Sequence, residues 1–395
     1  MKKRRMLITG VSGLLGNNLA YFFKESYEVT GLYLNHPVTL EGVITSKCDL
    51  TVKRNVAKAL EEFMPEIVIH CASLTNVDKC EKDTCLAEKL NHLCAKNIVD
   101  CLIDKPIKPV YISTDAVYSG ERENSCEDDS ANPQNYYGIS KYMGELEFRR
   151  KKQSLILRTY FFGWNIQDKE SIGEWVLNSL KSSQEIHCFK DALFSCIYTF
   201  DFARVLDKAI HGDLCGVFNC GTHNSVSKYK FALNIADVFG LERKYIVPSS
   251  TKDHPFAARR GLNLSMNVRK IENALNVTMP TIEDSIDNYY EDYQKGLPER
   301  IKAQKSEKSI SLIPYGRQYI NDEDIKAVIE TLESSYLTQG PKVKEFEDAL
   351  CHTTGAQFAV AVNSGTSALS LACLVAGVSL GDEVMTSPNT FVASA

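Results

Sequence analysis

The chain has 395 residues, of which 44% are hydrophobic and 24% charged, and its 45 Lys and Arg against 50 Asp and Glu give a net charge of −5. This composition excludes a mainly disordered or collagen-like chain and gives no electrostatic reason to expect nucleic-acid binding. At about 150 residues per domain, the length predicts two or three domains.

No apolar stretch reaches the ~18 residues that a membrane span needs. The basic residues 2–5 lead directly into a strand-like segment instead of the apolar core of a signal peptide. The thirteen cysteines contain no CxxC pair, so we interpret most of them as small buried hydrophobes and expect no metal site. Together these features predict a cytoplasmic protein without a membrane partner.

The first half of the chain alternates strand-like and helix-like segments. This order predicts an α/β fold of Rossmann type, in which a doubly wound parallel sheet carries helices on both faces. The expected elements are the strands Arg5–Thr9, Tyr27–Tyr33, Glu66–Cys71 and Pro109–Ser113 and the helices Gly13–Glu25, Val56–Phe63 and Thr84–Leu102.

The pattern becomes less regular after this sheet. Residues 155–293 mix short strands and helices, which favours a smaller substrate region over the C-terminal edge of the sheet, within a first domain of residues 1–296. Residues 297–311 are charged and poor in large apolar side chains, and are predicted to be a linker. Residues 312–395 then start a different α/β pattern, with helices at 322–334, 342–351 and 367–376 and strands at 358–362 and 383–386.

Glycines punctuate the turn between the first strand and the first helix. In Thr9–Gly16, Gly10 permits a tight turn, Gly13 lets a pyrophosphate approach the backbone, and Gly16 lets the helix pack against the strand. The helix N-terminus offers free N–H groups and a partial positive charge to phosphates. The turn therefore predicts a dinucleotide site.

The end of the second strand bears on which dinucleotide binds. An acidic residue there would hold the ribose hydroxyls of NAD and repel a 2′-phosphate. The segment Leu32–His36 contains none, so we favour NADPH and leave NADH open. Asp49 follows the third strand and is equally compatible with an adenine contact and with an ordinary turn.

A hydroxyl, a phenol and an amine form the candidate catalytic set. Tyr137 and Lys141 are four residues apart, so a helix places both on one face. Thr114 follows the strand that ends at Ser113, at the sheet edge where open α/β sheets bind ligands. We expect Lys141 to lower the pKa of the phenol and to hold the nicotinamide ribose. Tyr137 is expected to protonate a carbonyl oxygen as hydride arrives, and Thr114 to bond the same oxygen.

These motifs, with the runs 70–78, 112–120, 137–145 and 156–159, resemble an extended short-chain dehydrogenase/reductase, and more narrowly the dTDP-4-dehydrorhamnose reductase family. The resemblance implies reduction, by NADPH, of the 4-keto group of a nucleotide-diphospho-6-deoxysugar, with Thr114, Tyr137 and Lys141 as catalytic set. It implies cofactor contacts, besides Tyr137 and Lys141, at Gly10, Ser12, Gly13, Leu14, Leu15, Gly16, Asn35, Asp49, Leu50, Cys71, Ala72 and Ser73.

Two alternatives are weighed against this interpretation. The related 4,6-dehydratases use a Thr-Asp-Glu run, whereas Ala116 follows Thr114 and Asp115 here; without that glutamate, elimination lacks its base and ketone reduction is favoured. Ala116 also departs from the aromatic residue usual in the reductase family. The other alternative is a regulatory module that binds NADP without catalysis.

The segment from about residue 312 resembles the start of DegT/DnrJ/EryC1-type sugar aminotransferases, which use pyridoxal phosphate and have the fold of type I PLP-transferases. In that family the turn Ser364-Gly365-Thr366 holds the cofactor phosphate. The sequence stops before the family's Schiff-base lysine, so we expect this segment to be truncated and inactive as it stands, or part of a longer bifunctional protein acting on a UDP-4-keto-6-deoxy amino sugar.

The two resemblances together indicate one nucleotide-sugar pathway, for a surface polysaccharide or glycan. The expected partner is a nucleotide-sugar substrate. Exposed helices often pair the subunits of such folds, which makes a homodimer one expectation.

Overall fold

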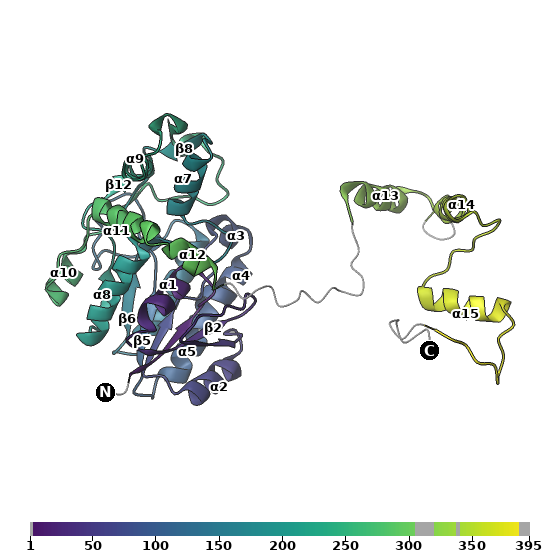
Figure 1. Cartoon of the computed structure of the whole chain (residues 1–395), viewed down its shortest axis with the longest axis horizontal. Coiled ribbons are helices and arrows are strands. Elements are labelled where there is room, and N and C mark those ends of the chain that lie inside the picture. Colours follow the sequence, from purple (N-terminus) through teal and green to yellow (C-terminus); the bar gives the residue numbers. More distant parts are fainter. Residues whose placement is uncertain (1–2, 305–319, 337–339, 387–395) are drawn as a thin grey trace. The chain divides into compact units, whose positions relative to one another are not determined.

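The computed structural model describes residues 3–304, 320–336 and 340–386. The chain divides into two compact units, residues 1–311 and residues 312–395 (Figure 1). Among the described residues, no helix combines the length and the apolar character needed to cross a bilayer.

A seven-stranded parallel sheet forms the centre of the first unit. Its strand order is β11-β6-β5-β4-β1-β2-β3, with bounds Gly216–Asn219, Leu155–Arg158, Lys108–Ile112, Ile67–His70, Arg5–Thr9, Glu28–Tyr33 and Val43–Lys47. From β1 the chain adds β2 and β3 on one side, then returns to add β4, β5, β6 and β11 on the other side. The direction in which strands are added therefore reverses between β1 and β4. Such a switch point opens a crevice at the carboxyl ends of the strands, where ligands bind.

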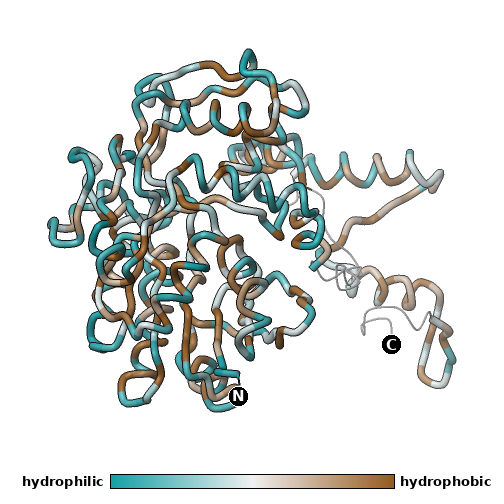
Figure 2. Tube along the Cα trace, turned by 60° about the vertical axis from the view of Figure 1, so that its left-hand side comes forward, coloured by the Kyte–Doolittle hydropathy of each residue, from teal (hydrophilic) through white to brown (hydrophobic). Residues whose placement is uncertain are grey.

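Helices cover both faces of the sheet, as the alternating pattern predicts. One apolar cluster joins the inner side of α1 (Leu14–Phe23) to α8 (Thr199–His211). A second joins α2 (Lys53–Phe63), α5 (Cys94–Leu102) and α6 (Tyr136–Arg149). Along the helices the colour alternates between hydrophobic and hydrophilic (Figure 2), which is typical of helices with one packed face.

The predicted helix over 84–102 is broken into three pieces. Helix α4 (Thr84–Ala87) passes through a π-helical turn, η1 (Glu88–Leu93), into α5. Asn91 lies in this turn, and its side chain donates to Leu74 O at 3.1 Å and to Ser140 Oγ at 3.0 Å. The irregular turn therefore brings a buried amide between the loop after β4 and α6.

Residues 155–294 supply the region over the carboxyl edge of the sheet. Its helices are α7 (Ile172–Lys181), α9 (Lys228–Val238), α10 (Arg269–Leu275) and α11 (Ile282–Gln294). Short paired strands connect them: β7 (Tyr160–Phe162) with β10 (Cys196–Tyr198), β8 (Ile186–Phe189) with β13 (Ile246–Ser249), and β9 (Leu193–Phe194) with β12 (Val226–Ser227) and β14 (Asn263–Leu264). The remaining short helices of the first unit are α3 (Val77–Lys82), η2 (Asp115–Val117), η3 (Arg243–Tyr245) and η4 (Thr251–Asp253).

The start of the predicted linker is helical. Helix α12 (Leu297–Lys302) buries Leu297 and Ile301 against the first unit. Gln304 accepts a bond from Asn17 Nδ2 at 3.0 Å, and its carbonyl accepts one from Thr39 N at 3.0 Å. The sequence pattern did not predict this helix, because its packed face has only two large apolar side chains, Leu297 and Ile301. The rest of the predicted linker, 305–311, lies outside the described residues.

The second unit contains three of its expected helices, α13 (Asp322–Glu333), α14 (Pro341–Thr354) and α15 (Gly365–Val375). The strands expected at 358–362 and 383–386 are not formed. A strand needs a hydrogen-bonded neighbour, and the described part of this unit supplies none. Its apolar side chains stand in solvent, with Phe358 86% exposed and Val375 88% exposed.

Candidate active site

A cavity of about 1040 Å³ opens at the carboxyl edge of the sheet. Except for Lys141, every predicted catalytic or cofactor residue of the first unit lines it: Gly10, Ser12, Gly13, Leu14, Leu15, Gly16, Asn35, Asp49, Leu50, Cys71, Ala72, Ser73, Thr114 and Tyr137. Lys141 lies just beneath this surface and is 3% exposed. The topology therefore brings together residues from six segments of the sequence.

The glycine turn has the geometry that its spacing predicts. Gly10 has a φ of +71°, and a Cβ there would lie 2.8 Å from the Ala72 backbone. A Cβ on Gly16 would lie 2.3 Å from the Gly10 carbonyl oxygen, so only glycine permits this approach of helix and strand. Gly13 begins α1 without a side-chain cap, which leaves helix N–H groups for the phosphates of a dinucleotide.

The far end of the cavity is lined by the loops after β2 and β3. Asn35 and His36 stand where an acidic residue would select NAD, and neither carries a carboxylate. Asp49 accepts bonds from Thr51 N at 2.9 Å and Thr51 Oγ1 at 2.7 Å. Asp49 thus both shapes a turn and faces the cavity, so the structure accommodates both interpretations of it.

Thr114 and Tyr137 both line the middle of the cavity, and their side chains interact. Thr114 follows β5, and Tyr137 lies in the first turn of α6, which Asn135 caps by accepting from Gly138 N. Burial raises the pKa of the Tyr137 phenol, and the hydrogen bond with Thr114 opposes that shift. A neutral phenol beside a hydroxyl is a suitable proton donor to a carbonyl oxygen.

The Lys141 side chain is directed toward the end of strand β5. Its Nζ donates to the Ile112 carbonyl at 2.6 Å and lies 4.4 Å from the centre of the Tyr111 ring. The pKa of Tyr137 is raised, chiefly by burial. The ammonium of Lys141 is turned toward the strand, and its expected effect on the phenol stays a prediction. Burial lowers the pKa of Lys141 itself to about 8.

A buried ion pair fixes the helix that carries Tyr137. Glu145 accepts from Arg158 Nε at 3.0 Å, from Arg158 Nη2 at 2.9 Å and from Ser113 Oγ at 2.6 Å. Both charged side chains are essentially inaccessible to solvent. Arg158 Nη1 also donates to Tyr118 Oη at 2.9 Å. This network holds α6 against the ends of β5 and β6.

The cavity also contains charged residues that sequence spacing did not identify as site residues, and three of them come from separate elements. Asp115 follows Thr114, Lys228 begins α9, and Arg260 comes from the loop before β14. Arg260 Nη2 donates to Asp78 Oδ2 at 2.7 Å, and the guanidinium lies 5.0 Å from the Phe256 ring centre. Arg260 Nη1 is buried with no hydrogen-bond partner among the described residues. An unpaired guanidinium nitrogen at a cavity is suited to an anionic ligand group.

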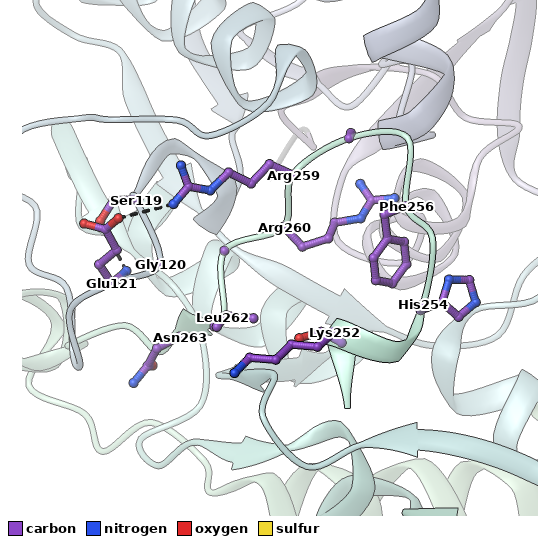
Figure 3. Close-up of a pocket in the computed structure, with 13 residues that line it drawn as sticks. Ser119, Gly120, Glu121, Lys252, His254, Phe256, Arg259, Arg260, Leu262 and Asn263 are labelled. Atoms are coloured by element: carbon purple, nitrogen blue, oxygen red, sulfur yellow. Dashed lines mark hydrogen bonds and ion pairs between the residues drawn. The ribbon is translucent and has the colours of Figure 1, made fainter. Parts of the chain in front are cut away.

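Arg260 also lines an adjoining cavity of about 580 Å³, together with Lys252, His254 and Arg259. Figure 3 shows Arg259 turned toward Glu121 and Arg260 turned toward Phe256, so the two arginines point to different sides of the loop. The rings of His254 and Phe256 stack with centroids 4.5 Å apart. The two cavities share Arg260 and Phe256, so a cation and an aromatic ring lie where they adjoin.

In the second unit, Ser364 caps α15 by accepting from Ser367 N. Ser364-Gly365-Thr366 therefore opens a helix, as predicted. Among the described residues, no cluster of His, Cys, Asp and Glu has the arrangement of a metal site.

Both units resemble known proteins. The RmlD substrate binding domain model matches residues 4–295. The chain is 31% identical over 287 residues to methionine adenosyltransferase 2 subunit beta of Danio rerio, covering 68% of this chain and 84% of the relative. The structure of dTDP-4-dehydrorhamnose reductase from Bacillus anthracis in complex with NADP superposes with a TM-score of 0.66 at 28% identity, covering 74% of this chain and all of that one.

The second unit matches the DegT/DnrJ/EryC1/StrS aminotransferase family over residues 318–395. There the chain is 51% identical over 83 residues to the spore coat polysaccharide biosynthesis protein SpsC of Bacillus subtilis, and it spans 21% of that relative. These findings fit an NAD(P)-dependent oxidoreductase joined to part of an aminotransferase segment. The chain belongs, by the match over most of its length, to the family of the RmlD substrate binding domain.

Proposed function

We propose that the first unit reduces the 4-keto group of a nucleotide-diphospho-6-deoxysugar with NADPH, in the biosynthesis of a surface polysaccharide. The observation that carries this proposal is the Thr114–Tyr137 pair in the same cavity as the glycine turn. Bound NADPH supplies hydride. Tyr137 then protonates the carbonyl oxygen of the sugar, and Thr114 holds that oxygen in place.

The cofactor proposal rests on the cavity lining. The uncapped start of α1 and the close approach at Gly16 suit a pyrophosphate. Asn35 at the end of β2 neither repels a 2′-phosphate nor bonds both ribose hydroxyls as a carboxylate would. Asn35→Asp is therefore expected to weaken NADPH binding and to strengthen NADH binding, as measured by fluorescence titration.

The substrate proposal rests on two of the cations that line the cavity. Arg260 and Lys228 are close enough to repel one another, and both line the cavity. Two neighbouring cations with one unpaired buried nitrogen favour a ligand with two negative charges, such as a diphosphate. A sugar at Tyr137 would then carry its diphosphate at Arg260 and its nucleoside toward the cavity of Figure 3.

The decisive assay follows nicotinamide absorbance with NADPH and a panel of dTDP- and UDP-linked 4-keto-6-deoxysugars. Tyr137→Phe is expected to lower turnover by about 100-fold or more while leaving NADPH binding close to wild type. Tyr136→Phe is the matched control, because Tyr136 is adjacent but bonds Glu88 instead of lining the cavity. Equal turnover in Tyr137→Phe and Tyr136→Phe would exclude the proposed acid.

A second candidate is a subunit that binds NADP without catalysis. The similarity to a protein named as a subunit of methionine adenosyltransferase favours it, whereas the complete Thr114, Tyr137 and Lys141 set favours an enzyme. NADPH binding without oxidation by any keto-sugar of the panel would support the regulatory module and overturn the reductase. The presence of an aminotransferase segment supports the same nucleotide-sugar pathway for both units.

A further inference from the structure

Asp115 is a buried carboxyl group at the middle of the reaction cavity. It begins η2 directly after Thr114 and is 1% exposed. Its Oδ1 accepts from Thr114 Oγ1 at 3.0 Å. Its Oδ2 is buried and has no hydrogen-bond partner among the described residues. A buried carboxylate with an unsatisfied oxygen is costly, which favours the neutral acid at this place.

The surroundings of Asp115 include one cation. Lys228 faces it from the start of α9, and the other ionisable groups around it are Tyr137 of α6, Tyr160 of β7 and Cys196 of β10. Burial is the largest influence and raises the pKa of Asp115 to about 7, while Thr114 and Lys228 oppose the shift. Lys228 thus stabilises the carboxylate that remains after a proton leaves.

Thr114 connects Asp115 to Tyr137. A threonine hydroxyl has a single proton and two acceptor positions. When Asp115 is ionised, that proton can point to Oδ1, which lies 3.0 Å from Thr114 Oγ1. When Asp115 is protonated, the carboxyl group can donate to Thr114, and the Thr114 proton is free to face the phenol oxygen of Tyr137. The protonation state of Asp115 therefore decides whether Thr114 donates its proton to Asp115 or to Tyr137.

We propose that Asp115 is the proton reserve of this site, passing its proton through Thr114 to Tyr137 when Tyr137 protonates the sugar. This inference rests on the proposed reductase function. Asp115 does not touch the reacting atoms of the sugar. It acts on Tyr137 only through the Thr114 hydroxyl, and is therefore a positioning residue. The predicted set of Thr114, Tyr137 and Lys141 does not include it.

The step balances in protons and electrons. Hydride from NADPH forms the new C–H bond and reduces the carbonyl carbon, and the Tyr137 O–H bond breaks as the O–H bond of the product alcohol forms. The Thr114 proton then moves to the phenol oxygen, and the Asp115 proton moves to Thr114. One carboxylate remains beside Lys228, and water protonates it again after the product leaves.

Lys141 is the competing source of the proton. Its Nζ is bonded to the Ile112 carbonyl at 2.6 Å, whereas the Thr114 side chain interacts with Tyr137. The two routes differ in their pH dependence, because burial holds the pKa of Lys141 at about 8.

The kinetic test compares the pH profile of kcat in wild type, Asp115→Asn and Thr114→Val, each with NADPH saturating. Wild-type turnover is expected to fall as the pH rises through about 7. Asp115→Asn still offers an oxygen to Thr114 but has no acidic proton, so turnover should drop by about 10- to 100-fold at pH 6 and the limb near pH 7 should vanish. Asp237→Asn, at the exposed end of α9, should retain the wild-type profile.

Thr114→Val removes the hydroxyl that links Asp115 to Tyr137 and leaves Asp115 in place. It too should remove the fall of kcat near pH 7. The double variant should be no slower than the slower single variant, because both belong to one path. An unchanged limb in Asp115→Asn would assign the proton to Lys141 and overturn the proposal. NADPH titration of each variant verifies that the cofactor half is folded.

An infrared measurement tests the reserve without any sugar. The carbonyl band of a protonated carboxyl group, in the difference between wild type and Asp115→Asn, should appear as the pH is lowered through about 7. Absence of that band at pH 6 overturns the proposal whether or not the chain reduces a sugar. If the band is present but no keto-sugar is reduced, the proton reserve is supported and the proposed function fails.

Discussion

Replacing Arg158 with Met isolates the contribution of the buried ion pair beneath α6. The side chain of Arg158 is 1% exposed and that of Glu145 is fully buried, so solvent does not screen the pair. Arg158 makes two bonds to Glu145 and one to Tyr118. Met fills much of the aliphatic volume, but it leaves the Glu145 carboxylate with only Ser113 and Arg149 as partners. Breaking a buried pair in this way costs about 3–5 kcal/mol.

The assay is urea unfolding followed by tryptophan fluorescence. Both tryptophans of the chain, Trp164 and Trp175, lie in the first unit, so the signal reports that unit alone. Arg150→Met is the matched control. Arg150 also binds two carboxylates, those of Asp100 and Glu147, but is 44% exposed, and surface pairs contribute about 0–1 kcal/mol.

The double variant Glu145→Gln with Arg158→Met separates the two parts of the cost. It removes the unpaired charge, so the free energy of unfolding should recover part of the loss seen in Arg158→Met. If Arg158→Met is no less stable than Arg150→Met, or if the double variant recovers nothing, the buried charge is not what makes Arg158 important.

Three further outcomes follow from the same contacts. Lys151→Met should lower the free energy of unfolding by about 1–3 kcal/mol in urea, because Lys151 Nζ donates to three carbonyls at the C-terminal end of α5 and just after it, at 2.9, 3.3 and 2.6 Å. An unchanged midpoint would contradict this capping role. Ile301→Ala should cost about 2 kcal/mol or more, because the side chain is fully buried under α12, whereas the exposed Lys302→Ala should cost little. Burial, and secondarily Lys141, lower the pKa of His70 to about 3. Because the pKa in the unfolded chain is about 6.5, only the unfolded chain binds this proton between pH 6.5 and 3. The free energy of unfolding should therefore fall as the pH falls through that window, and His70→Gln should make this pH dependence less steep.

Local sequence patterns were sufficient to predict which residues of the glycine turn and the strand ends line one cavity. Gly10 and Gly16 occupy positions where a Cβ would collide with nearby backbone atoms. Only glycine fits there, so their spacing in the sequence predicts this turn. Thr114 comes at the end of a buried strand and Tyr137 near the start of a helix, and the parallel sheet brings both ends to one edge. Each of these inferences needs only neighbouring residues and one rule of topology.

The substrate half could not be predicted in this way. Lys228 and Arg260 are separated from Tyr137 by about a hundred residues of short strands, whose pairing has no strong periodicity. Likewise, the four-residue spacing places Lys141 on the face of Tyr137 but does not say which way the long side chain turns. Its direction depends on Ile112, whose carbonyl it binds.

The stripe of α6 that carries Tyr137, Lys141 and Glu145 links stability to chemistry. These residues recur every four positions, so they face the sheet one above another. Lys141 binds the carbonyl of Ile112, and Glu145 binds Ser113 and Arg158. Thr114 follows Ser113 directly, so the same contacts hold the strand end that presents Thr114 to Tyr137. A change at Glu145 is therefore expected to affect proton transfer by displacing these two hydroxyls, even though Glu145 does not line the cavity.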